Sequence, residues 1–232
     1  MSGARSDPAR ERILARVRDA LNKRGGARDA AAARADAESH VAAHAPGPRP
    51  RMPADLTARF MQRATDMEST VERIAGRSEI PARVARYLDA LTLPPALAAQ
   101  RSREGVCWPE FADLDWAGAG LAIAPRPTAG DDRLGVTGAF CAIAETGTLV
   151  LLAGAATPTA TMLLPDTHVA VVPAARIVAG MEDAFALIRR ERGMLPRAVN
   201  LVSGPSRTGD IEQTIVLGAH GPYRVHILVV DD

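Results

Sequence analysis

The feature that most constrains the fold is a series of short, almost continuously apolar runs that begins after Pro95 and alternates with turn residues. Runs that are apolar at nearly every position are typical of strands covered on both faces. A helical stretch, residues 180–192, lies between two of these runs, and strand–helix–strand alternation predicts an α/β sandwich with three-layer character. The predicted strands are residues 120–124, 141–144, 148–152, 169–172, 198–202 and 224–230.

The N-terminal part of the chain has a different composition. Apolar residues at helical spacing after Pro8, namely Ile13, Leu14, Val17 and Leu21, predict a helix. Alanine, arginine and proline dominate up to about residue 53, and the prolines favour an extended linker. We therefore expect an N-terminal helix and flexible arm over residues 1–52 and an α/β domain over 53–232. Apolar spacing predicts two further helices, residues 56–75 and 79–91.

Composition excludes several kinds of chemistry. Lys23 is the one lysine among 232 residues, so the folded body lacks the lysine of a P-loop or a Schiff base. Cys107 and Cys141 are 34 positions apart, which excludes an iron–sulfur cluster or a structural zinc site built within this chain. No histidine pair has metal-ligand spacing. We expect neither a metal nor a cofactor.

Charge and hydropathy also limit the partners. Aromatic residues make up 3% of the chain, too few for base-stacking platforms, so nucleic-acid binding is not predicted. No apolar run approaches the roughly 18 residues of a membrane span, and the start lacks the apolar core of a secretory signal. The expected location is the cytoplasm.

The first candidate site is the polar turn Glu145-Thr146-Gly147-Thr148 between two apolar runs. Polar turns between buried strands lie at the sheet edge, where α/β proteins commonly bind ligands. Glu145 is a candidate general base, nucleophile or hydrogen-bond anchor, and Thr146, Gly147 and Thr148 are candidate ligand-binding residues. The alternative is that these groups only satisfy the backbone of a tight turn.

The second candidate site is the segment from Ser203 to Glu212, which follows a predicted strand. A glycine- and hydroxyl-rich loop that leads into a helix is an anion site, and an arginine adds donors for phosphate or carboxylate. Asp210 is a candidate catalytic residue, but it is equally the natural N-cap of that helix. The candidate ligand-binding residues here are Gly204, Ser206, Arg207, Thr208 and Glu212.

The histidines of the body favour packing or turn roles over catalysis. His168 and His226 fall at or within apolar runs. His220 is the exception, because it closes the segment that contains the polar loop, and it is the third catalytic candidate after Glu145 and Asp210.

Three motifs in order carry a resemblance to a known family: IAETGTLVLL, LLPDTHVAVVP and NLVSGPSRTGDIEQTIVLGAHGPYRVHILVVDD. From about Gly135 to the C-terminus the chain resembles the LUD domain of the lactate utilization protein C (LutC-like) family. The family often has an arginine near residues 157–161, whereas this chain has Thr157-Pro158-Thr159-Ala160-Thr161. Any anion contact from that position is therefore in doubt.

The resemblance implies a fold of the NagB/RpiA/CoA transferase-like type. It also implies a role in the oxidation of L-lactate to pyruvate, beside two iron–sulfur partner proteins (LutA-like and LutB-like). The first hypothesis is thus an accessory component without a redox centre that binds a small anionic ligand. The alternative, which rests partly on analogy of fold, is a stand-alone acyl/CoA or phosphosugar transferase or isomerase that uses Glu145.

Overall fold

A computed structural model describes residues 8–24, 30–45, 47–92, 102–211 and 214–231. The chain divides into two compact units, residues 1–49 and 50–232. The first unit contains α1 (Pro8–Arg24), which begins at the predicted proline, and α2 (Ala30–Ala43). The helix α2 was not predicted, although alanine is the strongest helix former. The prolines that predict an extended linker follow this helix.

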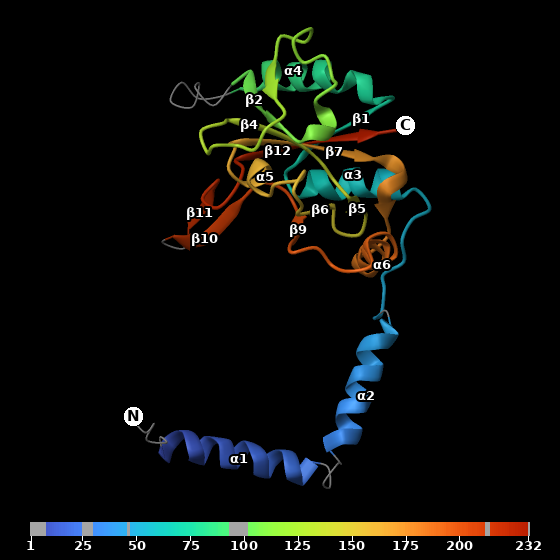
Figure 1. The fold of residues 1–232 in the computed structure, drawn as a ribbon, viewed down its shortest axis with the longest axis vertical. Coiled ribbons are helices and arrows are strands. Elements are labelled where there is room, and N and C mark those ends of the chain that lie inside the picture. Colours follow the sequence, from blue (N-terminus) through green and yellow to red (C-terminus); the bar gives the residue numbers. More distant parts are fainter. Residues whose placement is uncertain (1–7, 25–29, 46, 93–101, 212–213, 232) are drawn as a thin grey trace. The chain divides into compact units, whose positions relative to one another are not determined.

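The second unit is built on a six-stranded, fully parallel sheet in the order β1-β12-β7-β4-β2-β3 (Figure 1). An all-parallel sheet requires cover on both faces, in agreement with its apolar strands. The strands are β1 (Thr70–Ile74), β2 (Glu104–Cys107), β3 (Ala122–Ala124), β4 (Leu134–Gly138), β7 (Thr167–Pro173) and β12 (Arg224–Val230).

The strand β12 occupies an interior position in this sheet although it is the last in sequence. Ile227 is in register with Val71 of β1 on one side and with Ala170 of β7 on the other. Ile227 to Val230 are all buried. The predicted strand at 224–230 is therefore confirmed, and it joins β1 to the rest of the sheet.

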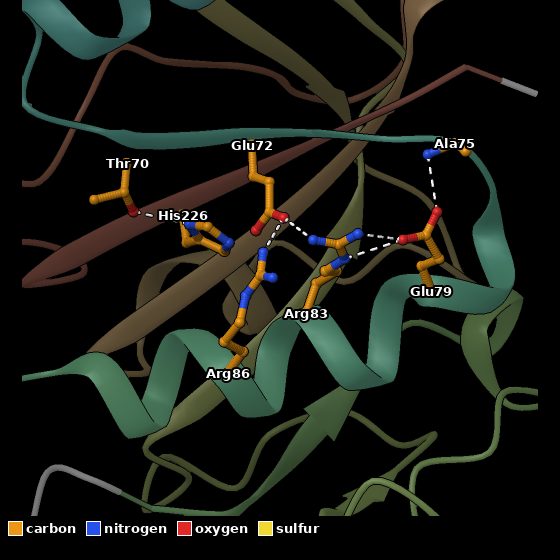
Figure 2. A network of polar contacts seen from close by, with 7 residues as sticks. All are labelled: Thr70, Glu72, Ala75, Glu79, Arg83, Arg86 and His226. Atoms are coloured by element: carbon orange, nitrogen blue, oxygen red, sulfur yellow. Dashed lines mark hydrogen bonds and ion pairs between the residues drawn. The ribbon is translucent and has the colours of Figure 1, made fainter.

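The helix α4 (Ile80–Ala90) covers one face of the sheet, where it packs over β1 and β12 (Figure 1). Figure 2 shows the polar contacts that hold it there. The carboxylate of Glu72 on β1 accepts hydrogen bonds from Arg83, at 2.5 Å, and from Arg86. The ring of Tyr87 stacks on His226 of β12, with centroids 4.1 Å apart.

The opposite face carries α3 (Leu56–Asp66), α5 (Ala160–Leu163) and a second sheet (Figure 1). Asp55 caps α3 by accepting a hydrogen bond from the Ala58 N–H at 2.9 Å. The second sheet has the order β8-β5-β6-β9. Its strands are β5 (Cys141–Ile143), β6 (Thr148–Leu152), β8 (Ile177–Val178) and β9 (Val199–Val202).

The central strands of the second sheet, β5 and β6, are buried on both faces. Ala142 and Leu149 belong to the core shared with the six-stranded sheet, whereas Ile143 and Val150 pack with α6 (Met181–Arg192) in a separate core. Every position of β5, and all of β6 but Leu152, is buried, which explains the almost continuous apolar runs. The layers are thus helix, sheet, sheet and helix, and the α/β fold with an N-terminal helix is confirmed.

Two predicted helices are corrected. The helix expected over residues 56–75 ends at Asp66, and Thr70–Ile74 forms β1, because its β-branched side chains favour the strand state. Among the described residues, 204–211 and 214–231, no helix follows Ser203. Instead, β10 (Arg207–Ile211) and β11 (Thr214–Leu217) form an antiparallel hairpin, so Asp210 is not a helix N-cap.

Candidate functional site

The polar turn at residues 144–147 joins β5 to β6, as the sequence predicts. Gly147 has φ +70°, and a Cβ there would lie 2.4 Å from the backbone nitrogen of Ala64 in α3. Only glycine therefore fits where the turn meets this helix. The contact assigns Gly147 a packing role.

A chain of hydroxyl groups connects the two predicted segments. The Thr148 Oγ1 lies 2.7 Å from the Thr146 Oγ1 and 2.6 Å from the Ser203 Oγ. The contact forms because β6 and β9 are neighbours, with Leu149 in register with Val202. The structure therefore brings Thr146, Thr148 and the start of the 203–212 segment together.

Glu145 lies elsewhere, at the N-terminus of α6. Its N–H donates to the Ala179 carbonyl at 3.0 Å, and its Oε2 would lie 3.2 Å from a Cβ on Gly180. The Glu145 side chain is half-buried and forms no hydrogen bond or ion pair with any other described residue. Its carboxylate is thus available to accept a hydrogen bond or a proton, and no such contact links it to Ser206 or Thr208.

Two of the predicted anion ligands hold the end of α3 instead. Gly204 has φ +81°, and a Cβ there would lie 2.0 Å from the Met67 carbonyl oxygen. Arg207 donates a hydrogen bond to the same oxygen at 3.0 Å and forms an ion pair with Glu68 at 3.1 Å. The Nη2 group of Arg207 is therefore already engaged within the protein.

Ser206 is tied to the segment that precedes β12. It donates its N–H to the Pro222 carbonyl and accepts from the Gly218 N–H, both at 2.9 Å. Its hydroxyl accepts a hydrogen bond from the backbone N–H of His220 at 3.3 Å. The structure thus brings together Ser206 and His220, whose side chain is exposed.

Two of the remaining predicted residues lie in the hairpin. Thr208 is buried in β10, opposite Val216. The backbone of Asp210 belongs to the same strand. Glu212 lies outside the described residues.

A cavity of about 910 Å³ lies at the carboxyl edge of the six-stranded sheet. Trp108, Gly138, Pro173 and Val230 all line it, and each stands at or just beyond the end of one parallel strand. Open parallel sheets bind ligands at this edge. None of the candidate catalytic or ligand-binding residues that the sequence predicts lines the cavity.

The charged groups of the cavity differ in how they are paired. Arg77 forms two hydrogen bonds of 2.8 Å to Asp113, and Arg176 forms two, of 2.7 and 3.0 Å, to Glu191. Burial raises the pKa of Glu110, which lies against the backbone of Gly138. Burial therefore favours the protonated form of this carboxyl more than solvent exposure would.

The sequence contained a partial signal for this cavity. Its position follows from the rule that ligands bind at the carboxyl ends of parallel strands. However, β2 and β4 were not predicted as strands, so the residues that follow them, Trp108 to Glu110 and Gly138 to Phe140, were not recognised as neighbours.

The buried histidines have packing roles, as expected. The His168 Nε2 lies 2.8 Å from the Thr137 Oγ1, and the His226 Nδ1 lies 2.8 Å from the Thr70 Oγ1 (Figure 2). Burial lowers the pKa of each histidine to about 4. Both are therefore neutral at physiological pH.

Neither cysteine is placed for thiolate chemistry. Cys107 and Cys141 are free and buried, and burial raises the pKa of each thiol to about 11. Within the described ranges, no three His, Cys, Asp or Glu side chains are arranged to hold a metal ion. The same ranges contain no helix with the length and apolar character needed to cross a membrane.

Comparison with protein families gives a match to the LUD domain over residues 111–230. The chain belongs to the LUD domain family. The matched region begins shortly after β2 and ends at the last residue of β12. It contains the polar turn, the hairpin and most of the residues that line the cavity. Arg77 and Glu110 of the cavity precede it.

Several curated relatives of this LUD domain protein share one printed name. They are lactate utilization protein C of Bacillus licheniformis, 38% identical over 103 residues, and lactate utilization protein C 1 of Bacillus mycoides, 40% identical over 102. The protein from Shouchella clausii is 38% identical over 101 residues. The alignments cover 43% of this chain and 43–44% of each relative, so the chain matches less than half of their length.

A solved structure supports the fold of the LUD domain. The crystal structure of a DUF162 family protein from Deinococcus radiodurans superposes with a TM-score of 0.53. The superposition covers 78% of this chain and 99% of the other, at 24% sequence identity. The likeness establishes a shared α/β architecture.

Proposed function

We propose that this LUD domain protein takes part in the utilization of L-lactate. The observation that carries the proposal is the set of matches, at 38–40% identity, to proteins named lactate utilization protein C. The LUD domain match, residues 111–230, includes both polar segments that suggested the same family from the sequence.

Its role is that of an accessory cytoplasmic component beside two iron–sulfur proteins, LutA-like and LutB-like. The two buried, widely separated cysteines support a division of labour in which the partners carry the redox centres. The ligand contacts are the Glu145 carboxylate, which has no partner among the described residues, and the hydroxyls of Thr146, Thr148 and Ser203. Asp210, Glu212 and His220 remain candidate residues.

Growth on L-lactate tests this proposal. A deletion strain is complemented with the native gene, with Glu145→Gln or with the control Glu104→Gln, which alters an exposed carboxylate on β2. We expect the native gene and the control to restore growth, and Glu145→Gln to fail although it accumulates as folded protein. Normal growth of the deletion strain itself would refute the role in lactate utilization.

Association is tested separately. Tagged protein is mixed with the purified LutA-like and LutB-like proteins under anaerobic conditions, and the complex is followed by size-exclusion chromatography. We expect co-elution that depends on this chain. If the three proteins never associate, the accessory role is wrong, whereas the growth result stands on its own.

A second candidate function is an independent acyl/CoA or phosphosugar enzyme in which Glu145 is the base or nucleophile. It is favoured by one observation: the half-buried Glu145 carboxylate has no partner among the described residues. Turnover of acyl-CoA or phosphosugar substrates by the protein alone, lost in Glu145→Gln, would support it. No turnover and no thermal stabilisation by these substrates would exclude it.

A further inference from the structure

We infer that the cavity at the carboxyl edge of the six-stranded sheet binds an amphipathic organic carboxylate with an apolar body larger than lactate. This inference is independent of the proposed function, because it concerns residues outside the polar turn and the hairpin. The observations behind it are the size of the cavity, one unpaired cation, two free backbone donors and an exposed apolar rim.

The volume sets the size of the ligand. Small-molecule sites in proteins span about 300 to 1,000 Å³, and this cavity of about 910 Å³ lies near the upper end. A three-carbon acid such as lactate would leave most of it filled with water. A body that covers the aromatic and aliphatic lining is a better match to this space.

Arg192 supplies the charge for an anionic group. The Arg77 and Arg176 guanidinium groups are each neutralised by a bidentate carboxylate. Both Arg176 and Arg192 lie over the Phe140 ring, 4.5 and 5.6 Å from its centroid, but no described carboxylate forms an ion pair with Arg192. An arginine held by an aromatic ring keeps its planar donor fork free for a carboxylate.

The loop after β6 supplies further donors. Gly154, Ala155 and Ala156 line the cavity, and their lack of large side chains lets a ligand approach the backbone closely. The N–H groups of Ala155 and Ala156 donate to no described residue. Two amides and a guanidinium that line one cavity and have no partner among the described residues are typical of a site for an anionic group.

The rim supplies the apolar contact. Met194 and Leu195 line the cavity, yet they are 81% and 54% exposed. Large apolar side chains left open at the mouth of a cavity are typical of a binding surface. An apolar body that extends from Arg192 across Phe140 to this rim would cover them.

The fluorescence of Trp108 tests the inference, because Trp108 lines the cavity and Trp116, the second tryptophan of the chain, does not. In a Trp116→Phe background, the protein is titrated with octanoate, octanamide and L-lactate. We expect a saturable change with octanoate, at least about tenfold tighter than with L-lactate, because each buried methylene adds affinity. Octanamide, which lacks the charge, should bind about tenfold more weakly than octanoate.

Two substitutions locate the site. Arg192→Gln should weaken octanoate binding about tenfold, whereas Arg190→Gln, on the exposed side of the same helix, should leave it unchanged. Ala155→Phe fills the cavity from an exposed loop and should abolish the saturable change while the melting temperature stays the same. Equal binding of octanoate and L-lactate, or equal effects of the two arginine variants, would overturn the inference. Saturable octanoate binding that survives Ala155→Phe would place the ligand elsewhere and overturn it too.

Discussion

The hydroxyl groups of Thr148 and Ser203 lie 2.6 Å apart and join two segments that are 55 residues apart in sequence. Thr148 also contacts Thr146, so one buried hydroxyl connects the turn after β5 with the loop after β9. The polar character of these segments therefore has a structural component, whatever ligand they contact.

Thr148→Val tests the strength of this connection. The substitution keeps the shape of a buried side chain but removes the hydroxyl at the centre of the chain. We expect a loss of about 1 kcal/mol in the free energy of unfolding, measured by urea denaturation. Thr146→Val removes a terminal, half-buried member and should cost less. Equal losses in the two variants would show that Thr148 is not central.

Gly147→Ala should lower the stability of the fold strongly, although it adds only one methyl group. The residue has φ +70°, and the added methyl would lie 2.4 Å from the Ala64 nitrogen, so about 1–2 kcal/mol of backbone strain adds to about 1–3 kcal/mol of overpacking. Gly193→Ala is the matched control, because Gly193 has φ +71° and nothing within 4 Å of the added Cβ. Calorimetric melting of both variants measures the difference. If the melting temperatures of both variants fall equally, the contact of Gly147 with α3 does not contribute to the destabilisation.

The variant Arg207→Ala distinguishes a structural role of Arg207 from a role in anion binding. If Arg207 chiefly holds the end of α3 through Met67 and Glu68, the substitution should speed hydrogen exchange in β10 and β11. Global stability should change by less than about 1 kcal/mol, because the ion pair is largely exposed. Hydrogen exchange followed by mass spectrometry, with and without added phosphate, measures the effect. Unchanged exchange in the hairpin together with lost phosphate protection would instead favour the anion-ligand role.

Stability should fall as the pH decreases from about 6.5 towards 4. The unfolded chain protonates His168 near its ordinary pKa of 6.5, whereas burial lowers the pKa of His168 in the folded protein to about 4. The contribution is therefore fully present above pH 6.5 and is lost at roughly 1.4 kcal/mol per pH unit below it. His226 behaves in the same way.

Urea denaturation at pH 7, 6 and 5 measures this dependence, in a range where most carboxylates are still ionised. The variant His168→Gln keeps a hydrogen-bonding group for Thr137 but no longer titrates. We expect about half of the pH dependence to disappear in that variant. A slope identical to that of the native protein would show that His168 is not its source.

The sequence predicted the buried strands well and the glycine-containing strands poorly. Residues 149–152 and 227–230 are apolar throughout, and both lie in the strands expected over 148–152 and 224–230. β2 and β4 were missed because Gly105 and Gly135 are usual signs of turns. In the structure these glycines permit close contact, since a Cβ on Gly105 would lie 2.3 Å from the Leu134 oxygen.

The candidate site was predicted only in part for a related reason. Thr146, Thr148 and Ser203 meet as expected, because they flank strands that are neighbours. The acidic residues near 210 suggested a helix start, but the pairing of Arg207 with Leu217 closes a hairpin instead. The cavity draws its lining from segments spread between Arg77 and Val230, a proximity that only the sheet order determines.

The interior position of β12 has a consequence for biosynthesis. In the six-stranded sheet β1 pairs with β12 alone, and more than 150 residues separate the two partners, from Thr70 to His226. Such long-range parallel pairing forms slowly, because loop closure precedes any stabilising contact. β1 and α4 therefore lack this partner strand until β12 has been synthesised and is free to fold. Until then an apolar strand edge stays open, which makes nascent chains of this protein natural clients for chaperones.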